Sequence, residues 1–245
     1  MGLEEVGIAA AAFGGLAGLG LMIRVVVQRL RGESGSTAPS TGQYTDAELG
    51  TLPQVPGLLA LEAKEPGFVR ALLTTLKESG VTDMAPGSGY TGADLPGADR
   101  IASIISEESG YRPDIGNANG GATGLMQWIP KDDTGMTYIN LTTKQIAAMS
   151  GIQQARGPVK ATLKLWGASG RADPPMAGWG NHHGKPDDFV IARQGVDGKK
   201  YDYNKVYDAD KKGYITSGDV RRAVYKFLRL AQGKPRVRPD GRLVA

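Results

Sequence analysis

Two adjacent glutamates, Glu107 and Glu108, are the residues most able to do chemistry in the stretch from Ile104 to Pro130 (IISEESGYRPDIGNANGGATGLMQWIP). Glu108 follows Ile104 by four residues and Ile101 by seven, which places it on the apolar face of a helix. Glu107 is turned about 100° away and is expected to point outward. Burial among isoleucines raises the pKa of a carboxyl, and a glutamate that holds its proton near neutral pH can protonate a glycosidic oxygen. The alternative is a glutamate at a helix end that makes only a capping or surface contact.

The residues around Glu108 resemble a family signature. ESG at 108–110, GATGLMQ at 121–127 and the proline at 130 resemble the "ES…GA.GLMQ..P" pattern of soluble lytic transglycosylase (SLT) domains, which have a goose-type lysozyme-like fold. The resemblance implies that Glu108 is catalytic and that Ser109 helps to orient it. It also implies that the turn containing Gly124 forms the wall of the sugar groove, with Met126 as packing and Gln127 as a polar contact to the glycan.

The reaction that the resemblance implies needs one carboxyl group and no cofactor. Lytic transglycosylases cleave the β-1,4 bond between N-acetylmuramic acid and N-acetylglucosamine. Glu108 would protonate the leaving oxygen, the N-acetyl group would support the positive sugar, and the muramoyl 6-hydroxyl would then attack to give a 1,6-anhydro product. A muramidase that uses water remains an alternative if Asp114, Asp132 or Asp133 reaches the opposite face of the sugar.

The chain departs from the family downstream of this block. The family often has a Tyr-Asn-Ala-Gly segment at the site, and the nearest string here is AGWGN at 177–181. Trp179 and Asn181 are therefore weaker substrate-binding candidates, as an aromatic platform and an amide. The pair His182 and His183 is expected to have no chemical role, because adjacent histidines do not share a helical face and no carboxylate follows at ligand spacing.

A second motif, DADKKGYITSGD at 208–219, follows the EF-hand calcium-loop pattern. Asp208, Asp210 and Asp219 occupy positions 1, 3 and 12 of the loop, and Gly213 occupies position 6. Lys212 stands at position 5, where an oxygen ligand is normal, and position 12 is not the usual glutamate. The motif predicts either a weak calcium site or a metal-free loop that still turns the chain.

The elements that must position these residues are helical. Apolar spacing predicts a helix over 66–79, a second helix from about Ala98, and a helix over 220–231. Two further core helices are expected over 142–166, broken at Gly157-Pro158. The predicted fold class is mainly α: a lysozyme-like SLT domain preceded by an N-terminal transmembrane or membrane-associated helix and a flexible linker.

The N-terminus is apolar from Val6 to Ile23, long enough for a spanning helix. Ala10, Gly14 and Gly18 share one helical face, which favours self-association in lipid. A signal segment and a buried soluble helix remain alternatives. The basic residues that follow would hold the chain on the cytoplasmic side if a cell inserted it. The predicted units are a membrane helix over 1–31, a Gly/Ser/Pro-rich linker over 32–57, the transglycosylase domain over 58–233 and a basic tail over 234–245.

Composition narrows the function further. The 245 residues have a net charge of +4 and include no cysteine. The absence of cysteine excludes disulfides, thiol nucleophiles and cysteine-ligated zinc. The SLT resemblance, taken with the predicted membrane helix and linker, implies a virion-associated lytic transglycosylase that opens bacterial peptidoglycan during phage entry. The expected partners are peptidoglycan, a membrane through the N-terminal helix and other virion proteins, with no nucleic acid. A structural or pore-forming virion protein whose SLT-like domain only binds glycan, and a bacterial housekeeping transglycosylase, are the alternatives.

Overall fold

The computed structural model describes residues 44–81, 97–116, 121–172, 182 and 184–245. The described helices and strands are, in chain order, α1 (Asp46–Leu49), β1 (Leu52–Pro53), α2 (Leu58–Lys64), α3 (Phe68–Glu78), α4 (Gly97–Ser109), α5 (Thr143–Ala147), α6 (Gly151–Gln154), the π-helix η2 (Ala155–Val159), α7 (Lys160–Ala172), β2 (Val190–Arg193), α9 (Lys199–Asn204), the 3-10 helix η3 (Lys205–Tyr207), β3 (Tyr214–Thr216), α10 (Ser217–Val224), α11 (Lys226–Ala231), β4 (Arg236–Val237) and β5 (Leu243–Val244).

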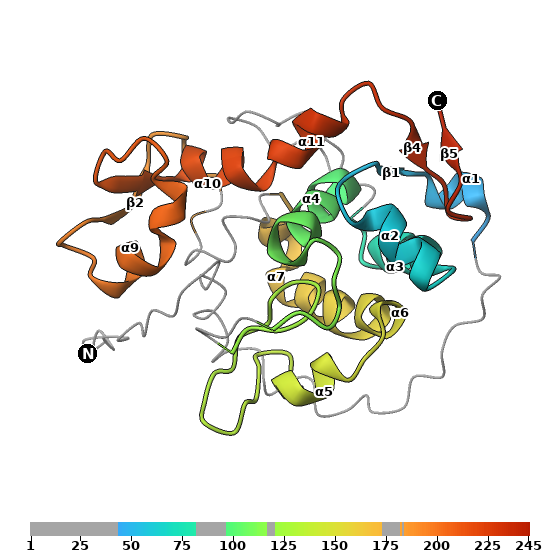
Figure 1. Ribbon diagram of the computed structural model, residues 1–245, viewed down its shortest axis with the longest axis horizontal. Coiled ribbons are helices and arrows are strands. Elements are labelled where there is room, and N and C mark those ends of the chain that lie inside the picture. The colour runs from blue at the N-terminus through green and yellow to red at the C-terminus, as the bar shows by residue number, and fades with distance from the viewer. Residues whose placement is uncertain (1–43, 82–96, 117–120, 173–181, 183) are drawn as a thin grey trace, which may run out of the picture.

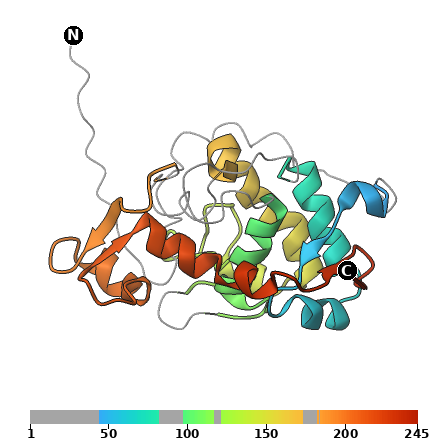
Figure 2. The same ribbon diagram turned by 90° about the horizontal axis from the view of Figure 1, so that it is seen from above.

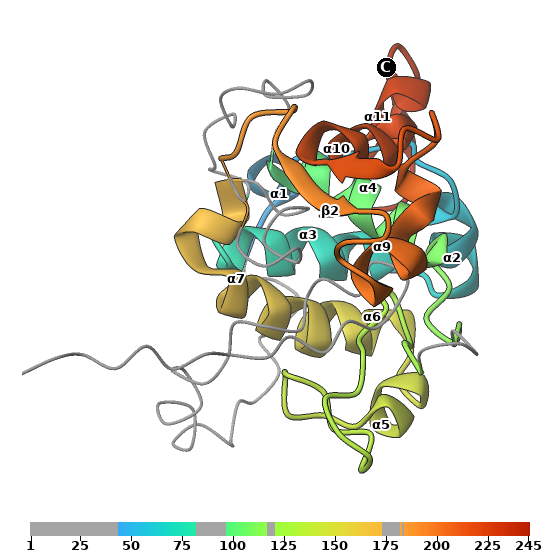
Figure 3. The same cartoon turned by 90° about the vertical axis from the view of Figure 1, so that its left-hand side faces the viewer.

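Helix α4 lies at the centre of the molecule, with other helices packed around it (Figure 1). Ile101, Ala102 and Ile105 are completely buried along it. Helices α10 and α11 lie above α4, while α6 and α7 lie on the opposite side, as Figure 3 also shows. The side chain of Ser103 donates a hydrogen bond to the carbonyl of Val224, which ties α4 to α10. The C-terminal end of α4, where Glu108 stands, is therefore enclosed by parts of the chain that are distant in sequence.

Strands β2 and β3 form a small antiparallel sheet in which Ala192 pairs with Ile215. With α9 and η3 they make a separate lobe, at the left of Figure 1. Figure 2 shows α10 and α11 running from this lobe, across the molecule, toward the C-terminal strands. The lobe is thus joined to the helical core through the same two helices that cover α4.

The segments on either side of the helical core pair with each other. Strand β4 pairs antiparallel with both β1 and β5, and Leu52 lies opposite Val237. Both of these side chains are completely buried. The sequence predicts a linker over 32–57 and a solvated tail over 234–245, but the described residues 44–57 and 234–245 fold against the core. Their few apolar side chains pack with each other and with the helical core, which neither segment reveals alone.

Arg236 explains why the basic C-terminal segment is not a free tail. Its guanidinium donates to the carboxylate of Asp99, at the start of α4, with distances of 2.7 and 3.0 Å. It also donates to the hydroxyl and the carbonyl of Thr51 at 2.7 and 2.9 Å. One side chain therefore joins the C-terminal segment, the segment before β1 and the central helix.

The predicted fold class is wrong. About 47% of the structure is helical, and none of the helices in the described ranges is both long and apolar enough to cross a membrane. The helices α4 and α7 have 13 residues each, whereas a bilayer core about 30 Å thick requires about 20 residues. The helix expected over Val6–Ile23, with its small-residue face, lies outside the described residues.

Two of the predictions for individual helices are confirmed and two are wrong in part. The helix expected over 66–79 is α3, and the helix expected from about Ala98 is α4. The expected break at Gly157-Pro158 is absent: Pro158 lies inside η2, which joins α6 directly to α7. A π-helical turn lacks the hydrogen-bond pattern that proline disrupts in an α-helix, and so the chain continues through it. The helix expected over 220–231 is divided at Tyr225 into α10 and α11.

Candidate active site

Glu108 lies at the penultimate position of α4 and is partly buried. Desolvation raises the pKa of this carboxyl well above its ordinary value, and the negative charge of Glu107 raises it further. The direction is the one that the helical spacing predicts. Among the residues that the structure describes, no side chain or backbone group donates a hydrogen bond to Glu108. Its carboxyl is thus biased toward the protonated form and is available to a ligand.

The neighbouring Glu107 does not point into solvent, as the sequence predicts. Its carboxylate forms an ion pair of 2.8 Å with the ammonium of Lys226, and its side chain is only 16% exposed. The prediction fails because α11 packs against this side of α4, which a single helix in isolation cannot show. The pair leaves a neutralised carboxylate directly beside the Glu108 carboxyl, which has no ion-pair partner within the described ranges.

Tyr207 is the second side chain at this site that the sequence did not single out. It ends η3 in the small lobe and is buried. Burial raises the pKa of its phenol, and the negative charges of Glu108 and Glu107 raise it further, so the phenol interacts electrostatically with both glutamates. A tyrosine that keeps its proton at all physiological pH values can serve as a hydrogen-bond donor. No spacing in the sequence connects Tyr207 to Glu108, because the two residues are 99 positions apart in the chain.

The end of α4 is held firmly beneath these side chains. The hydroxyl of Ser109 donates to the carbonyl of Ile105 at 3.1 Å, so its proton serves its own helix and not Glu108, contrary to the role expected from the resemblance. Two residues with positive φ, Gly110 and Tyr111, then reverse the chain. The Tyr111 hydroxyl donates to the carbonyl of Ala102 at 3.0 Å. The backbone at Glu108 is therefore fixed from both directions.

The turn that contains the GLMQ residues is a short hairpin closed by two backbone hydrogen bonds between Thr123 and Trp128. It docks on the segment that leaves α4, because the amide of Gly124 donates to the carbonyl of Ile115 at 2.9 Å. Gly124 has φ +77°, and a Cβ at this position would lie 2.6 Å from Oε1 of Gln154. Only glycine fits here, so the fold itself requires the glycine that the motif has at this position.

Gln154 is the group that holds this hairpin, and it is completely buried. Its Oε1 accepts from the amide of Leu125 at 2.9 Å. Its Nε2 donates to the carbonyls of Pro113, Ile146 and Met149 at 2.7, 3.0 and 3.2 Å. A glutamine on α6 thus joins the hairpin, the segment after α4 and the helix α5. The sequence marks it only as part of a core helix, since its partners come from three separate segments.

The two side chains expected at the sugar groove from this hairpin, Met126 and Gln127, are largely occupied by the fold. Met126 is buried, in keeping with its expected packing role. Gln127 is 9% exposed, and its Nε2 donates to the carbonyls of Gly124 at 3.0 Å and Ile115 at 3.4 Å. Its Oε1 accepts no hydrogen bond from any described residue. Gln127 can therefore offer a ligand one acceptor but not its donor.

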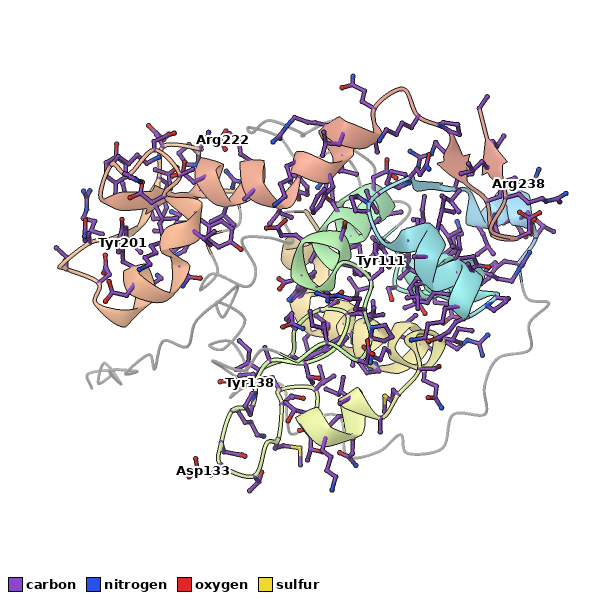
Figure 4. The ribbon with its side chains drawn as sticks, in the orientation of Figure 1. Tyr111, Asp133, Tyr138, Tyr201, Arg222 and Arg238 are labelled. Atoms are coloured by element: carbon purple, nitrogen blue, oxygen red, sulfur yellow. The ribbon has the colours of Figure 1, made fainter. Side chains whose placement is uncertain are left out.

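The carboxylates proposed for a muramidase lie on exposed loops. Asp114, Asp132 and Asp133 are all exposed. Asp133 is at the tip of a loop far from α4 in Figure 4. The carboxylate of Asp132 accepts from the hydroxyl and amide of Thr134, and these bonds lower its pKa.

The three acids of the EF-hand-like loop are not arranged around a cation site. Asp210 is exposed, whereas Asp208 and Asp219 are buried. The carboxylate of Asp219 is bound by the ammonium of Lys212 at 2.7 and 2.8 Å. No group of three or more metal-ligating side chains occurs anywhere in the described ranges. The residues present do not fit a calcium ion, and the expectation of calcium is not supported by this donor set.

Two of the substrate-binding candidates, Trp179 and Asn181, lie outside the described residues, as does His183. His182 packs its ring against Phe189, with centroids 5.2 Å apart.

Comparisons with family models, with curated proteins and with solved structures found no match to this chain.

Proposed function

We propose that this protein cleaves the glycan strands of bacterial peptidoglycan, with Glu108 as the general acid and then the general base of a lytic transglycosylase reaction. The observation that carries the proposal is the carboxyl of Glu108, which is partly buried, biased toward its protonated form and unpaired among the described residues. A glycosidic leaving group requires such a proton donor. The SLT-like motif points to the same residue independently.

The charges around Glu108 also support this role. Glu107 contributes a negative charge that favours the protonated form of Glu108, while its own pairing with Lys226 makes a second negative charge tolerable in a partly buried place. After proton donation, the Glu108 carboxylate can accept the proton of an attacking hydroxyl, because no described residue competes for it. One group can therefore serve both steps.

The positions of Asp132 and Asp133 favour the transglycosylase over the muramidase. A hydrolase that acts on this bond uses two carboxylates about 5–10 Å apart across the sugar. Asp133 lies far from α4 in Figure 4, and Asp132 is engaged by Thr134. Intramolecular attack by the muramoyl hydroxyl needs no second carboxylate. The location in a virion and the association with other virion proteins stay predictions, since no described residue bears on them.

The test is the pair Glu108→Gln and Asp133→Asn, assayed on purified peptidoglycan with mass analysis of the released fragments. Each substitution replaces one carboxylate by an amide, but only the first removes the proposed acid. We expect Glu108→Gln to reduce the rate about 10²–10⁴-fold, with the fold intact by circular dichroism, and Asp133→Asn to leave it unchanged. Products with 1,6-anhydro ends support the transglycosylase, whereas reducing ends indicate a muramidase. Full activity of Glu108→Gln would refute both.

A further inference from the structure

The loop Asp208–Asp219 has the backbone of a cation-binding loop although its donor set does not fit a cation. Gly213, at position 6, has φ +81°, the sharp turn that this position requires. Ile215, at position 8, is buried in β3 and pairs with Ala192 of β2. Thr216 then caps α10, with Asp219 completing the capping box. The loop is therefore fully folded, and some group must balance its two buried carboxylates.

The ammonium of Lys212 is placed to balance the negative charge of these carboxylates. Its Nζ lies 2.8 and 2.7 Å from the two oxygens of Asp219, the carboxylate at position 12 that normally closes on a calcium ion from two sides. The same Nζ lies 5.1 Å from the centre of the Tyr214 ring, within the range of a cation–π contact. Arg222 also binds Asp219. Burial would raise the pKa of Asp219, but hydrogen bonds from Lys212 and Thr216 lower it overall.

Asp208, the carboxylate at position 1, is occupied by hydrogen-bond donors. The hydroxyl of Tyr201 donates to its Oδ2, and the amides of Lys212 and Gly213 donate to Oδ1 and Oδ2 at 2.9 and 2.8 Å. The Tyr201 bond is the main reason why the pKa of Asp208 is lowered. Both buried carboxylates of the loop are thus satisfied by groups of the chain itself.

We propose that the side-chain ammonium of Lys212 takes the place of the divalent cation in this loop, so that the lobe folds without calcium and excludes it. A calcium ion requires six to eight oxygen ligands. Position 5 supplies an ammonium and no oxygen, and that ammonium already holds both oxygens of position 12. An incoming dication would have to displace Lys212 and then lie beside its positive charge.

The loop Asp208–Asp219 adjoins Tyr207 and α10, two elements next to the candidate active site. Tyr207, whose phenol interacts electrostatically with Glu107 and Glu108, immediately precedes Asp208. Asp219 lies near the start of α10, and α10 packs against α4. A loop held by Lys212 keeps both of these elements in place at any calcium concentration.

The proposal predicts that one substitution creates a calcium site. In the full-length protein, Lys212→Asp removes the ammonium and adds the missing carboxylate at position 5. The matched control is Lys211→Asp, which makes the same charge change at an exposed position that provides no ligand. Lys211 has φ +55°, a conformation that aspartate tolerates. Thermal unfolding and calorimetric titration with CaCl₂, each compared with EDTA, measure the result without reference to any enzymatic activity.

We expect the wild-type protein and Lys211→Asp to bind no calcium up to 5 mM and to keep the same Tm in CaCl₂ and in EDTA. Lys212→Asp should unfold at a lower temperature than the wild type in EDTA and regain on the order of 5 °C in 5 mM CaCl₂. Folding of Lys212→Asp only with calcium present would support the proposal equally. Lys212→Met should be destabilised but not rescued. Calcium binding by the wild type, or a Lys212→Asp protein that matches it in EDTA, would overturn the proposal.

Discussion

Replacing Glu107 by glutamine should change the pH dependence of catalysis while leaving the general acid in place. Glu107 is the only described charge found to raise the pKa of Glu108, after desolvation. Removing it lowers the pKa of Glu108. The substitution also leaves the ammonium of Lys226 facing a neutral amide, and a cation without its partner favours the ionised form of Glu108 in the same direction.

The size of this shift follows from Coulomb's law. Two carboxylates roughly 7 Å apart interact by about 2.4 kcal/mol at an effective dielectric constant of 20. Because one pKa unit corresponds to about 1.4 kcal/mol, the upper limit is a little under two units. Glu107 is paired with Lys226 and partly exposed, which reduces its effect, and so we expect a decrease on the order of one unit.

The assay is kcat/KM on peptidoglycan as a function of pH. The general acid must be protonated, so activity falls as the pH rises through the pKa of Glu108, and this alkaline limb should move to lower pH in Glu107→Gln. Carbon-13 NMR of the Glu108 carboxyl measures the same pKa without turnover. Asp133→Asn, with the same charge change far from α4, should leave the limb in place. An unmoved limb, or one displaced to higher pH, would refute the electrostatic reasoning.

Three further predictions concern stability. Glu108→Gln should stabilise the protein at pH 8 but not at pH 4. The raised pKa of Glu108 lowers the free energy of unfolding by an amount that is absent below the ordinary value of 4.5 and grows as the pH rises toward the folded-state pKa. Denaturant titration at both pH values measures this difference. Gly124→Ala should cost roughly 2–4 kcal/mol by the same method, because the new Cβ would overlap Oε1 of Gln154 at a positive φ; a neutral result would mean that the hairpin can move. Arg236→Met should cost about 2 kcal/mol, since it leaves a buried carboxylate on α4 without its partner. Arg242→Ala, at an exposed side chain of the same C-terminal segment, should leave the Tm unchanged, and equal effects of the two arginines would contradict the assigned role of Arg236.

Helical spacing was sufficient for the parts of the fold that depend on local sequence. The apolar residues of α3 and α4 recur at the period of a helix, and this predicts both ends of α3 within about two residues and the start of α4 within about one. It also predicted that Glu108 would share the buried face with Ile101 and Ile104. The raised pKa of Glu108 follows from that placement, since desolvation is its main cause.

The remaining parts of the site depend on contacts between distant segments. Lys226 pairs with Glu107 across more than one hundred residues of chain, and Tyr207 approaches the same end of α4 from the small lobe. The partners of Gln154 come from three segments, and Arg236 binds a carboxylate in the first half of the chain. Each of these residues looks like an ordinary polar side chain in its own segment. Only the packing of the helices gives it a specific partner.

The two charge clusters of the molecule are built on opposite principles, and this difference separates structure from function. In the small lobe, every oxygen of Asp208 and Asp219 receives a donor or a cation, so the ionised forms are favoured and the lobe is stabilised. At the end of α4, Glu107 receives a cation, while no cation from the described part of the chain pairs with Glu108. A partly buried carboxyl without a cationic partner reduces the free energy of unfolding as the pH rises. A glutamate with only a structural role would not require this loss of stability, whereas a general acid does. If pairing Glu108 with an introduced lysine on a facing helix raised the stability without lowering activity on peptidoglycan, this distinction would not hold.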